Sequence, residues 1–422
     1  MLGKDRTLPT PFVLAIIGLG AFITALDQTV VVTALPSVML DLKVPIAELD
    51  RVSWIITAYL LGYTVAMPLI GRLGDVYGYP RVYQASLVVF CVGTSLVALS
   101  SNLDWMVGAR VIQAVGGGAT VPIGMALATT LVPKGQRGLA LGVVGASAEA
   151  GAMLGPAYGG AIVELLSWRW IFWLNVPQSA VIFAALLWLP NRRDVAAKVD
   201  YMGGVILVGA LLVLSLALSR SGLFTFDSPY PFLLAAGGVG LVAVLVLVEA
   251  RTFQPLLAPV LFRSWAFLTS NLTQVLVGVV LIIAMVTVPL MANTVMGKSP
   301  FTGALWLLRL TGIIPLGAVV GGLLVNRLGP SPLTVTGLGL MAIGMFLASG
   351  WELGVADPEL TVHLLISGFG FGLVIAPITV HALDSAGEDY RGTAASLVVV
   401  SRMMGMTLGL AALSAWGVQH FQ

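Results

Sequence analysis

Charged side chains are scarce in this sequence. Asp, Glu, Lys and Arg make up 9% of its 422 residues, whereas a soluble domain carries about 25%. A chain with so little charge cannot cover a water-facing surface of ordinary polarity. Hydrophobic residues make up 58% of the chain and fall in runs of about 20, enough to cross ~30 Å of hydrocarbon as helices. The sequence therefore predicts an integral membrane protein.

Cysteine is almost lacking too. Cys91 is the one cysteine, which excludes an intrachain disulfide framework and a multi-cysteine metal site. We expect Cys91 to be a small packing residue. None of the three histidines is paired with another at metal-ligand spacing. We expect no metal, no cofactor and no nucleic-acid partner.

Signatures of other membrane machines are missing. The run Gly297-Lys298-Ser299 has Ala292 where a phosphate-binding loop needs glycine, which excludes an ATP-driven pump. A membrane enzyme is disfavoured because the sequence has no H-E-x-x-H motif and no Ser/His pair at a plausible membrane depth. A channel is disfavoured because few rings of charged residues are visible. The first apolar stretch is too long for a signal peptide, so we expect it to remain as a span.

Thirteen apolar segments have the length of membrane spans. An odd number of spans puts the two ends of the chain on opposite sides of the membrane. The predicted spans are 11–36, 53–71, 82–100, 103–131, 137–163, 168–190, 201–219, 231–250, 265–291, 301–325, 331–350, 360–382 and 391–416.

Lysine and arginine are distributed unevenly between these spans. With the N-terminus placed in the cytoplasm, thirteen basic residues of the connecting segments fall on that side and five on the other. Cytoplasmic segments of membrane proteins carry such an excess, so the bias predicts a cytoplasmic N-terminus. The inner residues are Lys4, Arg6, Arg72, Arg81, Lys134, Arg137, Arg192, Arg193, Lys198, Arg251, Arg263, Arg327 and Arg391, and the outer ones are Lys43, Arg51, Arg169, Arg220 and Lys298.

A short motif recurs at one topological position. The chain reads Gly71-Arg-Leu73-Gly-Asp75-Val-Tyr-Gly78 after the second span and Gly322-Leu-Leu324-Val-Asn326-Arg-Leu-Gly329 after the tenth. Parallel repeats of this kind characterise transporters whose substrate site lies between two halves. We therefore predict an N-terminal six-helix bundle at 1–190, two linking helices with flanking segments at 191–264, and a C-terminal bundle at 265–422.

Two pairs of opposite charges fall inside the predicted spans. Asp27 and Arg110 lie at similar depths in the first and fourth spans, and Glu149 and Arg402 lie near mid-membrane in the fifth and thirteenth. A charge held in hydrocarbon costs several kcal/mol unless it is paired or hydrated. Burial disfavours an ionised carboxylate and a nearby cation favours it, a competition suited to a proton carrier. The alternative to a role in proton transfer is that both pairs are purely structural. For Glu149 and Arg402 a further alternative is that they do not pair, and that each interacts separately with the substrate or the proton.

Glycine spacing marks a third feature. Gly151, Gly155 and Gly159 are four residues apart, with Pro156 and Gly160 beside them. Such spacing lets helix backbones approach closely in a membrane, and proline kinks a helix. A further basic residue, Arg309, lies inside the tenth span, where it either extends to the outer surface or meets an anionic substrate group.

These motifs together resemble the fourteen-span drug:proton antiporter branch of the major facilitator superfamily, especially the mycobacterial-type exporters of triacylglycerides and lipoglycans. The resemblance covers nearly the whole chain. It rests on the segments Leu26–Pro36, Ile55–Gly62, Gly71–Arg81, Gly151–Gly160 and Val398–Met406.

The resemblance assigns roles to the singled-out residues. It implies that Asp27 and Arg110 form the proton-coupling site and that residues like Glu149 and Arg402 take part in transport. We therefore expect Glu149 and Arg402 to couple the proton to the substrate path. The glycine segment corresponds to the antiporter motif, thought to shape the interface that opens between the halves. The loop with Gly71, Asp75, Gly78 and Arg81 corresponds to the cytoplasmic gate, although Tyr79 and Pro80 replace its usual basic residues. Asp75 is then expected to cap a helix or to meet an arginine of the other half.

The sequence thus predicts an all-α integral membrane protein with the major facilitator fold, two bundles and two extra central helices. The implied function is proton-coupled export of lipids or hydrophobic drugs by alternating access, and a proton-symport importer is the alternative. The resemblance implies a bacterial inner-membrane monomer whose partners are membrane lipids, protons, a hydrophobic substrate and a periplasmic lipid-carrying lipoprotein. The family has fourteen spans, so we expect its last helix to be missing from this chain.

Overall fold

The computed structural model describes residues 9–45, 49–52, 54–190, 200–218, 229–252, 255 and 259–421. Over these residues the chain forms helices and no β-strand. A helix bonds all its backbone N–H and C=O groups internally, as hydrocarbon requires. Within the described ranges, eleven helical segments are long and apolar enough to span a membrane.

The N-terminal half is a bundle of long helices joined by short turns. The short helices α2 (Leu49–Val52) and η2 (Lys134–Gln136) precede two of its longer members. The continuous long helices are α1 (Thr10–Asp41), α3 (Trp54–Tyr77), α4 (Tyr79–Ala98) and α7 (Arg137–Leu165). Two further members are each divided into two helices, α5 (Leu103–Gly117) with α6 (Thr120–Leu131), and α8 (Trp168–Trp173) with α9 (Asn175–Leu186).

The C-terminal half repeats this plan after a linking pair. The pair consists of α10 (Tyr201–Leu218) and α12 (Tyr230–Glu249), and the short helix α13 (Pro259–Arg263) follows. The half itself contains α14 (Trp265–Leu290), the π-helical turn η3 (Met291–Val295), α15 (Pro300–Gly312) with α16 (Ile314–Leu328), α17 (Pro330–Ser349), α18 (Asp357–Ala386), the turn η4 (Glu388–Tyr390) and α19 (Arg391–Phe421).

The thirteen predicted spans compare closely with these helices, although two of them are not among the eleven segments. The predicted span 168–190 is divided at Leu174 into α8 and α9, and the apolar part of α10 is a shorter helix, Tyr201–Ala217. Within the predicted linking region 191–264, residues 191–199, 219–228, 253–254 and 256–258 lie outside the described residues.

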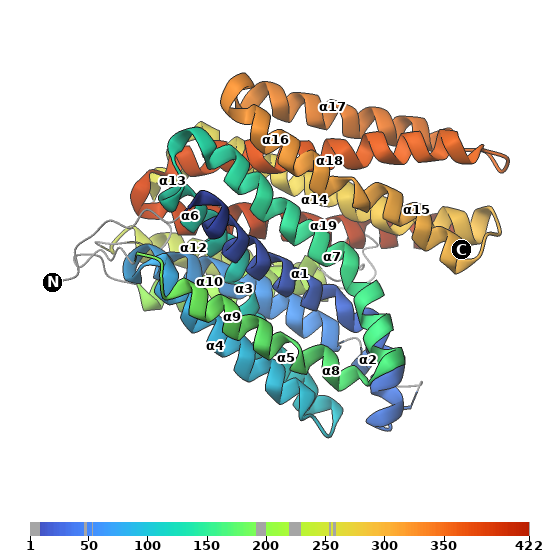
Figure 1. Ribbon diagram of the computed structural model, residues 1–422, viewed down its shortest axis with the longest axis horizontal. Helices are drawn as coiled ribbons and strands as arrows, with labels where there is room; N and C mark the ends of the chain where they lie inside the picture. Colours follow the sequence, from blue (N-terminus) through green and yellow to red (C-terminus); the bar gives the residue numbers. More distant parts are fainter. Residues whose placement is uncertain are drawn as a thin grey trace.

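The two bundles meet at one end of the molecule and diverge at the other (Figure 1). We call the converging end, where Gly78 joins α3 to α4, the Gly78 end, and the opposite end, where Asn102 begins α5, the Asn102 end. Contacts between the halves run mainly from α3 to α19 and from α7 to α16 and α18. The linking helix α10 packs on α12, α3 and α19, so the pair lies outside these crossings.

Glycines set how closely the halves approach at the Gly78 end. A Cβ placed on Gly322 of α16 would lie 2.5 Å from the carbonyl oxygen of Gly138 on α7. A Cβ on Gly71 of α3 would lie 2.5 Å from the carbonyl oxygen of Gly392 on α19. Both distances are shorter than van der Waals contact, so any larger residue would push the helices apart.

Candidate functional site

Asp27 lies in a fully buried polar site inside the N-terminal half. Its Oδ2 accepts a hydrogen bond from Nη1 of Arg110 at 2.9 Å, and both side chains are 0% exposed. Its Oδ1 accepts from Nε2 of Gln113 at 3.0 Å and from Nδ2 of Asn175 at 2.6 Å. The helices α1, α5 and α9 thus bring one carboxylate, one guanidinium and two amides together. The structure thus brings Asp27 and Arg110, which the sequence places at similar depths, into direct contact.

Arg110 is held by more than the carboxylate. Its Nη1 also donates to Oε1 of Gln113 at 2.7 Å, and its Nε donates to the carbonyl of Ile55 at 3.4 Å. Its guanidinium lies 3.9 Å from the centre of the Tyr59 ring, a cation–π contact. A buried charge pair is stable when its remaining donors and acceptors are satisfied, and here most of them are.

Glu149 and Arg402 form a second ion pair, this time between the halves. Nη1 of Arg402 on α19 lies 2.6 Å from Oε1 of Glu149 on α7. The side chain of Arg402 is 16% exposed and that of Glu149 is 14% exposed, because both face a cavity rather than a closed core. Of the two arrangements left open by the sequence, pairing is the one observed.

That cavity has a volume of about 330 Å³ and is lined by both halves. Its walls are mostly apolar, and four methionines contribute to them: Met153, Met285, Met403 and Met406. Flexible thioether side chains adapt to ligands of irregular shape. Gln28 and Thr29 of α1 reach the cavity, whereas their neighbour Asp27 points to the opposite side of that helix.

Asp75 connects the halves at the Gly78 end. Its Oδ1 accepts hydrogen bonds from the backbone N–H of Gly392 at 2.7 Å and from the hydroxyl of Tyr79 at 2.7 Å. Its Oδ2 accepts from the N–H of Thr393 at 3.1 Å and from that residue's hydroxyl at 2.9 Å. Asp75 therefore caps the N-terminus of α19, where the unpaired N–H groups favour a negative charge.

The other gate residues are arranged around this contact. Gly71 gives the close approach to α19, and Gly78 adopts φ +91°, a conformation that glycine tolerates. Arg81 is exposed and lines an apolar groove with Leu73 and Tyr77. The residues beside this groove come from α3, α4 and α5, so Arg81 does not face the other half.

The glycine segment of α7 packs on α1 within the same half. A Cβ on Gly155 would meet the carbonyl of Leu26 at 2.8 Å, and one on Gly159 would meet that of Val30 at 2.5 Å. Gly151 faces the carbonyl of Phe22 in the same way, Gly160 has open space beside it, and Pro156 lines the central cavity. The close contacts of α7 with the other half come instead from residues nearer its start.

Arg309 lies toward the Asn102 end and has protein partners. Its Nη1 donates to Oδ1 of Asp357 at 2.8 Å and to the hydroxyl of Thr361 at 2.7 Å. Both partners lie in the first turns of α18, so the side chain extends toward the surface. Among the described residues, no cluster of three or more His, Cys, Asp or Glu side chains could hold a metal ion.

Asn175 is a site residue that sequence reasoning missed. It is an isolated amide in an otherwise apolar stretch, Ile171-Phe-Trp-Leu-Asn175-Val. A buried polar side chain requires a hydrogen-bond partner, so its isolation was a usable signal. Gln113 lies one helical turn after Arg110 and was equally accessible to this reasoning.

Comparison with known proteins agrees with this architecture. Residues 17–410 match the family model of the Major Facilitator Superfamily. The chain belongs to this superfamily. It is therefore a multi-pass membrane transporter by family, rather than an enzyme.

Among curated relatives of this superfamily, a triacylglyceride transporter of Mycolicibacterium hassiacum is 37% identical over 96% of this chain and 78% of its own length. One of Mycobacterium tuberculosis is 35% identical over 96% of this chain and 82% of its own. Among solved structures, the proton:xylose symporter XylE has a TM-score of 0.69 at 15% identity, covering 98% of this chain and 91% of its own. A human organic anion transporter has a TM-score of 0.66 at 17% identity, covering 98% and 96%. These structures support the fold alone.

Proposed function

We propose that this protein is a proton-coupled exporter of lipids of the triacylglyceride or lipoglycan type, able also to move hydrophobic drugs. Within the superfamily we assign it to the fourteen-span drug:proton antiporter branch. The observation that carries the proposal is the Glu149–Arg402 ion pair inside an apolar cavity between the halves. The curated names of the relatives support a lipid substrate.

The cavity combines apolar walls with one pair of charges. An apolar wall binds acyl chains without specific hydrogen bonds, and a charged pair offers polar ester or sugar groups a partner. A volume of about 330 Å³ accommodates only part of such a lipid. The remainder of the lipid therefore has to extend from the cavity toward the membrane or the Asn102 end.

Helix α1 provides a mechanical connection between the proton site and the cavity. Asp27 lies on one side of this helix, and Gln28 and Thr29 line the cavity on the other. The hydroxyl of Thr29 donates to the carbonyl of Ala152 at 2.9 Å, three residues from Glu149. Protonation of Asp27 weakens its attraction to Arg110, and the resulting shift of α1 is passed to α7 through these close contacts.

Alternating access requires that one side of the central cavity be closed. The halves are in contact at the Gly78 end and diverge at the Asn102 end. We assign the Gly78 end to the cytoplasm of a bacterial inner membrane, because positively charged loops favour that side. The conformation is then outward-facing, ready to release lipid and to take up a proton.

Transport in proteoliposomes with an imposed pH gradient tests the proposal. The substrates are a fluorescent triacylglyceride analogue and a hydrophobic dye, and Asp27→Asn is compared with the parent. We expect the gradient-driven rate to fall at least tenfold, while exchange without a gradient continues. If the parent transports the fluorescent lipid at a rate that excess dye does not change, the result would favour lipid as the substrate.

Asp41→Asn is the matched control. It removes the same charge from the same helix, but Asp41 lies at the surface beside Arg169. If Asp27→Asn transports as fast as the parent, the proton assignment is wrong. Uptake driven by the same gradient would identify an importer. Faster release when a periplasmic lipid-carrying lipoprotein is added outside would support such a lipoprotein as a partner.

A further inference from the structure

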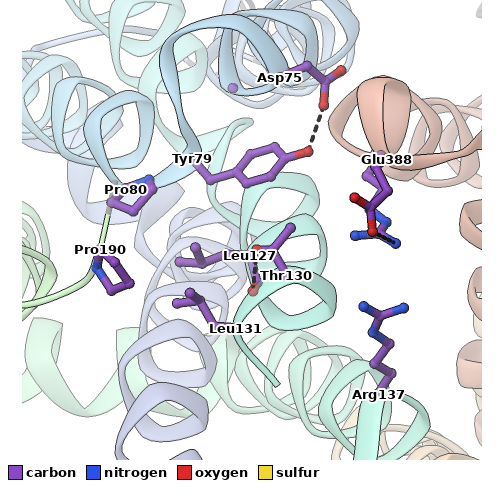
Figure 2. A pocket seen from close by; sticks show the side chains of 11 residues that line it. Asp75, Tyr79, Pro80, Leu127, Thr130, Leu131, Arg137, Pro190 and Glu388 are labelled. Atoms are coloured by element: carbon purple, nitrogen blue, oxygen red, sulfur yellow. Dashed lines mark hydrogen bonds and ion pairs between the residues drawn. The ribbon is translucent and has the colours of Figure 1, made fainter. Parts of the chain in front are cut away.

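A second cavity lies between the halves at the Gly78 end, separate from the central one. Its volume is about 500 Å³. One wall comes from α3, α4, α6 and α7 of the N-terminal half, and the other from η4 and the start of α19 (Figure 2). The proposed transport mechanism uses none of its basic residues.

Two arginines face this cavity from opposite halves. Arg391 begins α19, and its side chain is 10% exposed. Arg137 begins α7 and points across the cavity toward Glu388 in Figure 2. Within the part of the chain that the structure describes, the buried Nε of Arg137 has no hydrogen-bond partner. A buried donor without an acceptor is costly, so this side chain has unused hydrogen-bonding capacity beside the cavity.

The nearby carboxylates do not satisfy Arg137. Asp75 already accepts four hydrogen bonds, one of them from Tyr79. Oε1 of Glu388 lies 3.2 Å from Nη2 of Arg391, so Glu388 pairs with Arg391. The side chain of Glu388 is 79% exposed. Asp384 and Arg137 both line an adjacent cavity of about 280 Å³. Among the ion pairs of the described residues, none within 4.0 Å joins Asp384 to Arg137.

The cavity also has an apolar side. Leu127 and Leu131 of α6 form one part of its wall, and Pro80 and Pro190 form another. The combination of two guanidinium groups and an apolar wall matches an anion that carries a non-polar part. Guanidinium groups bind phosphate oxygens with two parallel hydrogen bonds.

We propose that this cavity binds a phosphate group between Arg137 and Arg391, either the headgroup of an anionic phospholipid or free phosphate. The two arginines belong to different halves, so the bound anion stabilises the closed Gly78 end by binding that conformation more tightly. This is a binding site distinct from the central cavity, and it does not depend on the identity of the exported substrate.

Thermal unfolding of the purified full chain in nanodiscs tests the site. Inorganic phosphate is titrated into neutral phosphatidylcholine discs, and phosphatidic acid is incorporated in a second series. A ligand that binds the folded state raises its melting temperature. We expect one of these two probes to stabilise the parent, and the Kd of that probe to rise at least tenfold in Arg137→Gln.

Lys134→Gln is the matched control, because Lys134 is exposed and lies three residues before Arg137 but does not line this cavity. Stabilisation by phosphate in neutral discs would support the site with a free ion as ligand, and stabilisation by phosphatidic acid alone would support it with a lipid headgroup. No stabilisation by either probe, or equal losses in Arg137→Gln and Lys134→Gln, would overturn the proposal. If Arg137→Gln does not fold, Arg137→Lys keeps the charge and removes the planar fork, and the same weakening is expected.

Discussion

Asp75 and Asn326 occupy the same position of the repeated motif, and each forms a hydrogen bond across the boundary between the halves. Asp75 accepts from the N–H of Gly392 at 2.7 Å, and Nδ2 of Asn326 donates to the carbonyl of Gly135 at 2.7 Å. One contact joins α3 to the start of α19, and the other joins α16 to the segment before α7. The repeat thus produces two related connections, both at the Gly78 end.

The first prediction concerns opening of the Gly78 end in Asp75→Ala. The substitution removes four hydrogen bonds to a carboxylate, and such bonds to charged groups contribute about 1.5–3 kcal/mol each. We expect at least a tenfold faster reaction of a cysteine at Thr311, in the central cavity, with a membrane-impermeant maleimide supplied from the Gly78 side. Cys91→Ser provides the background, since Cys91 is the one native cysteine.

Arg81→Gln is the control for that labelling. Arg81 belongs to the same motif but is exposed and lines a groove within its own half. Its substitution should leave the labelling rate unchanged. Equal rates for Asp75→Ala and the parent would mean that the capping contact does not hold the halves together.

The second prediction concerns the polar site around Asp27. Asn175→Ala removes one of three donors to this carboxylate and leaves a small cavity. We expect a loss of ~2–3 kcal/mol in the free energy of unfolding, measured by denaturation in nanodiscs, together with fewer protons moved per substrate.

Asn293→Ala separates this effect from a general cost of losing an amide. The Oδ1 of Asn293 has no hydrogen-bond partner among the described groups, so its removal should cost less than ~0.5 kcal/mol. A loss of similar size in both variants would argue against a specific role for Asn175.

The sequence placed Asp27 and Arg110 at similar depths because depth follows from helix ends and a fixed rise of ~1.5 Å per residue. The same count placed Glu149 and Arg402 near mid-membrane, but it cannot say which helix faces which. The sequence likewise left two partners for Asp75, a helix N-terminus or an arginine of the other half. It could not decide between them, because it does not show which helix begins beside Asp75.

Glycine spacing shows the same limit. The regular set Gly151, Gly155 and Gly159 packs on α1 within one half, whereas the crossing of the halves uses Gly138 and Gly322. Spacing shows that a helix face permits close approach. The neighbour that uses this face depends on tertiary packing.

The third prediction is a double-mutant cycle on the ion pair of the central cavity. Glu149→Gln and Arg402→Gln each leave a partly buried charge without its partner, whereas the double variant leaves none. We expect a coupling free energy of ~1–3 kcal/mol, measured by unfolding in nanodiscs. All three variants should lose gradient-driven transport.

The pair of Arg309 and Asp357 is the matched control for this cycle. Its charges are 29% and 65% exposed, so water screens them, and the coupling should stay below ~1 kcal/mol. A coupling as small for Glu149 and Arg402 would show that the two groups act independently.

The fourth prediction concerns the closest approach of the halves. Gly71→Ala adds a Cβ that would lie 2.5 Å from the carbonyl oxygen of Gly392 and would also meet the hydroxyl of Ser396. Helices α3 and α19 must separate to accommodate it, at a cost of ~1–3 kcal/mol to the closed conformation. Each 1.4 kcal/mol changes the ratio of closed to open molecules about tenfold. Labelling of the cysteine at Thr311 from the Gly78 side should therefore accelerate about tenfold. Gly339→Ala, in a helix with nothing within 4 Å of the new Cβ, should label at the parental rate. If Gly71→Ala also labels at the parental rate, the contact of α3 with α19 does not limit opening at this end.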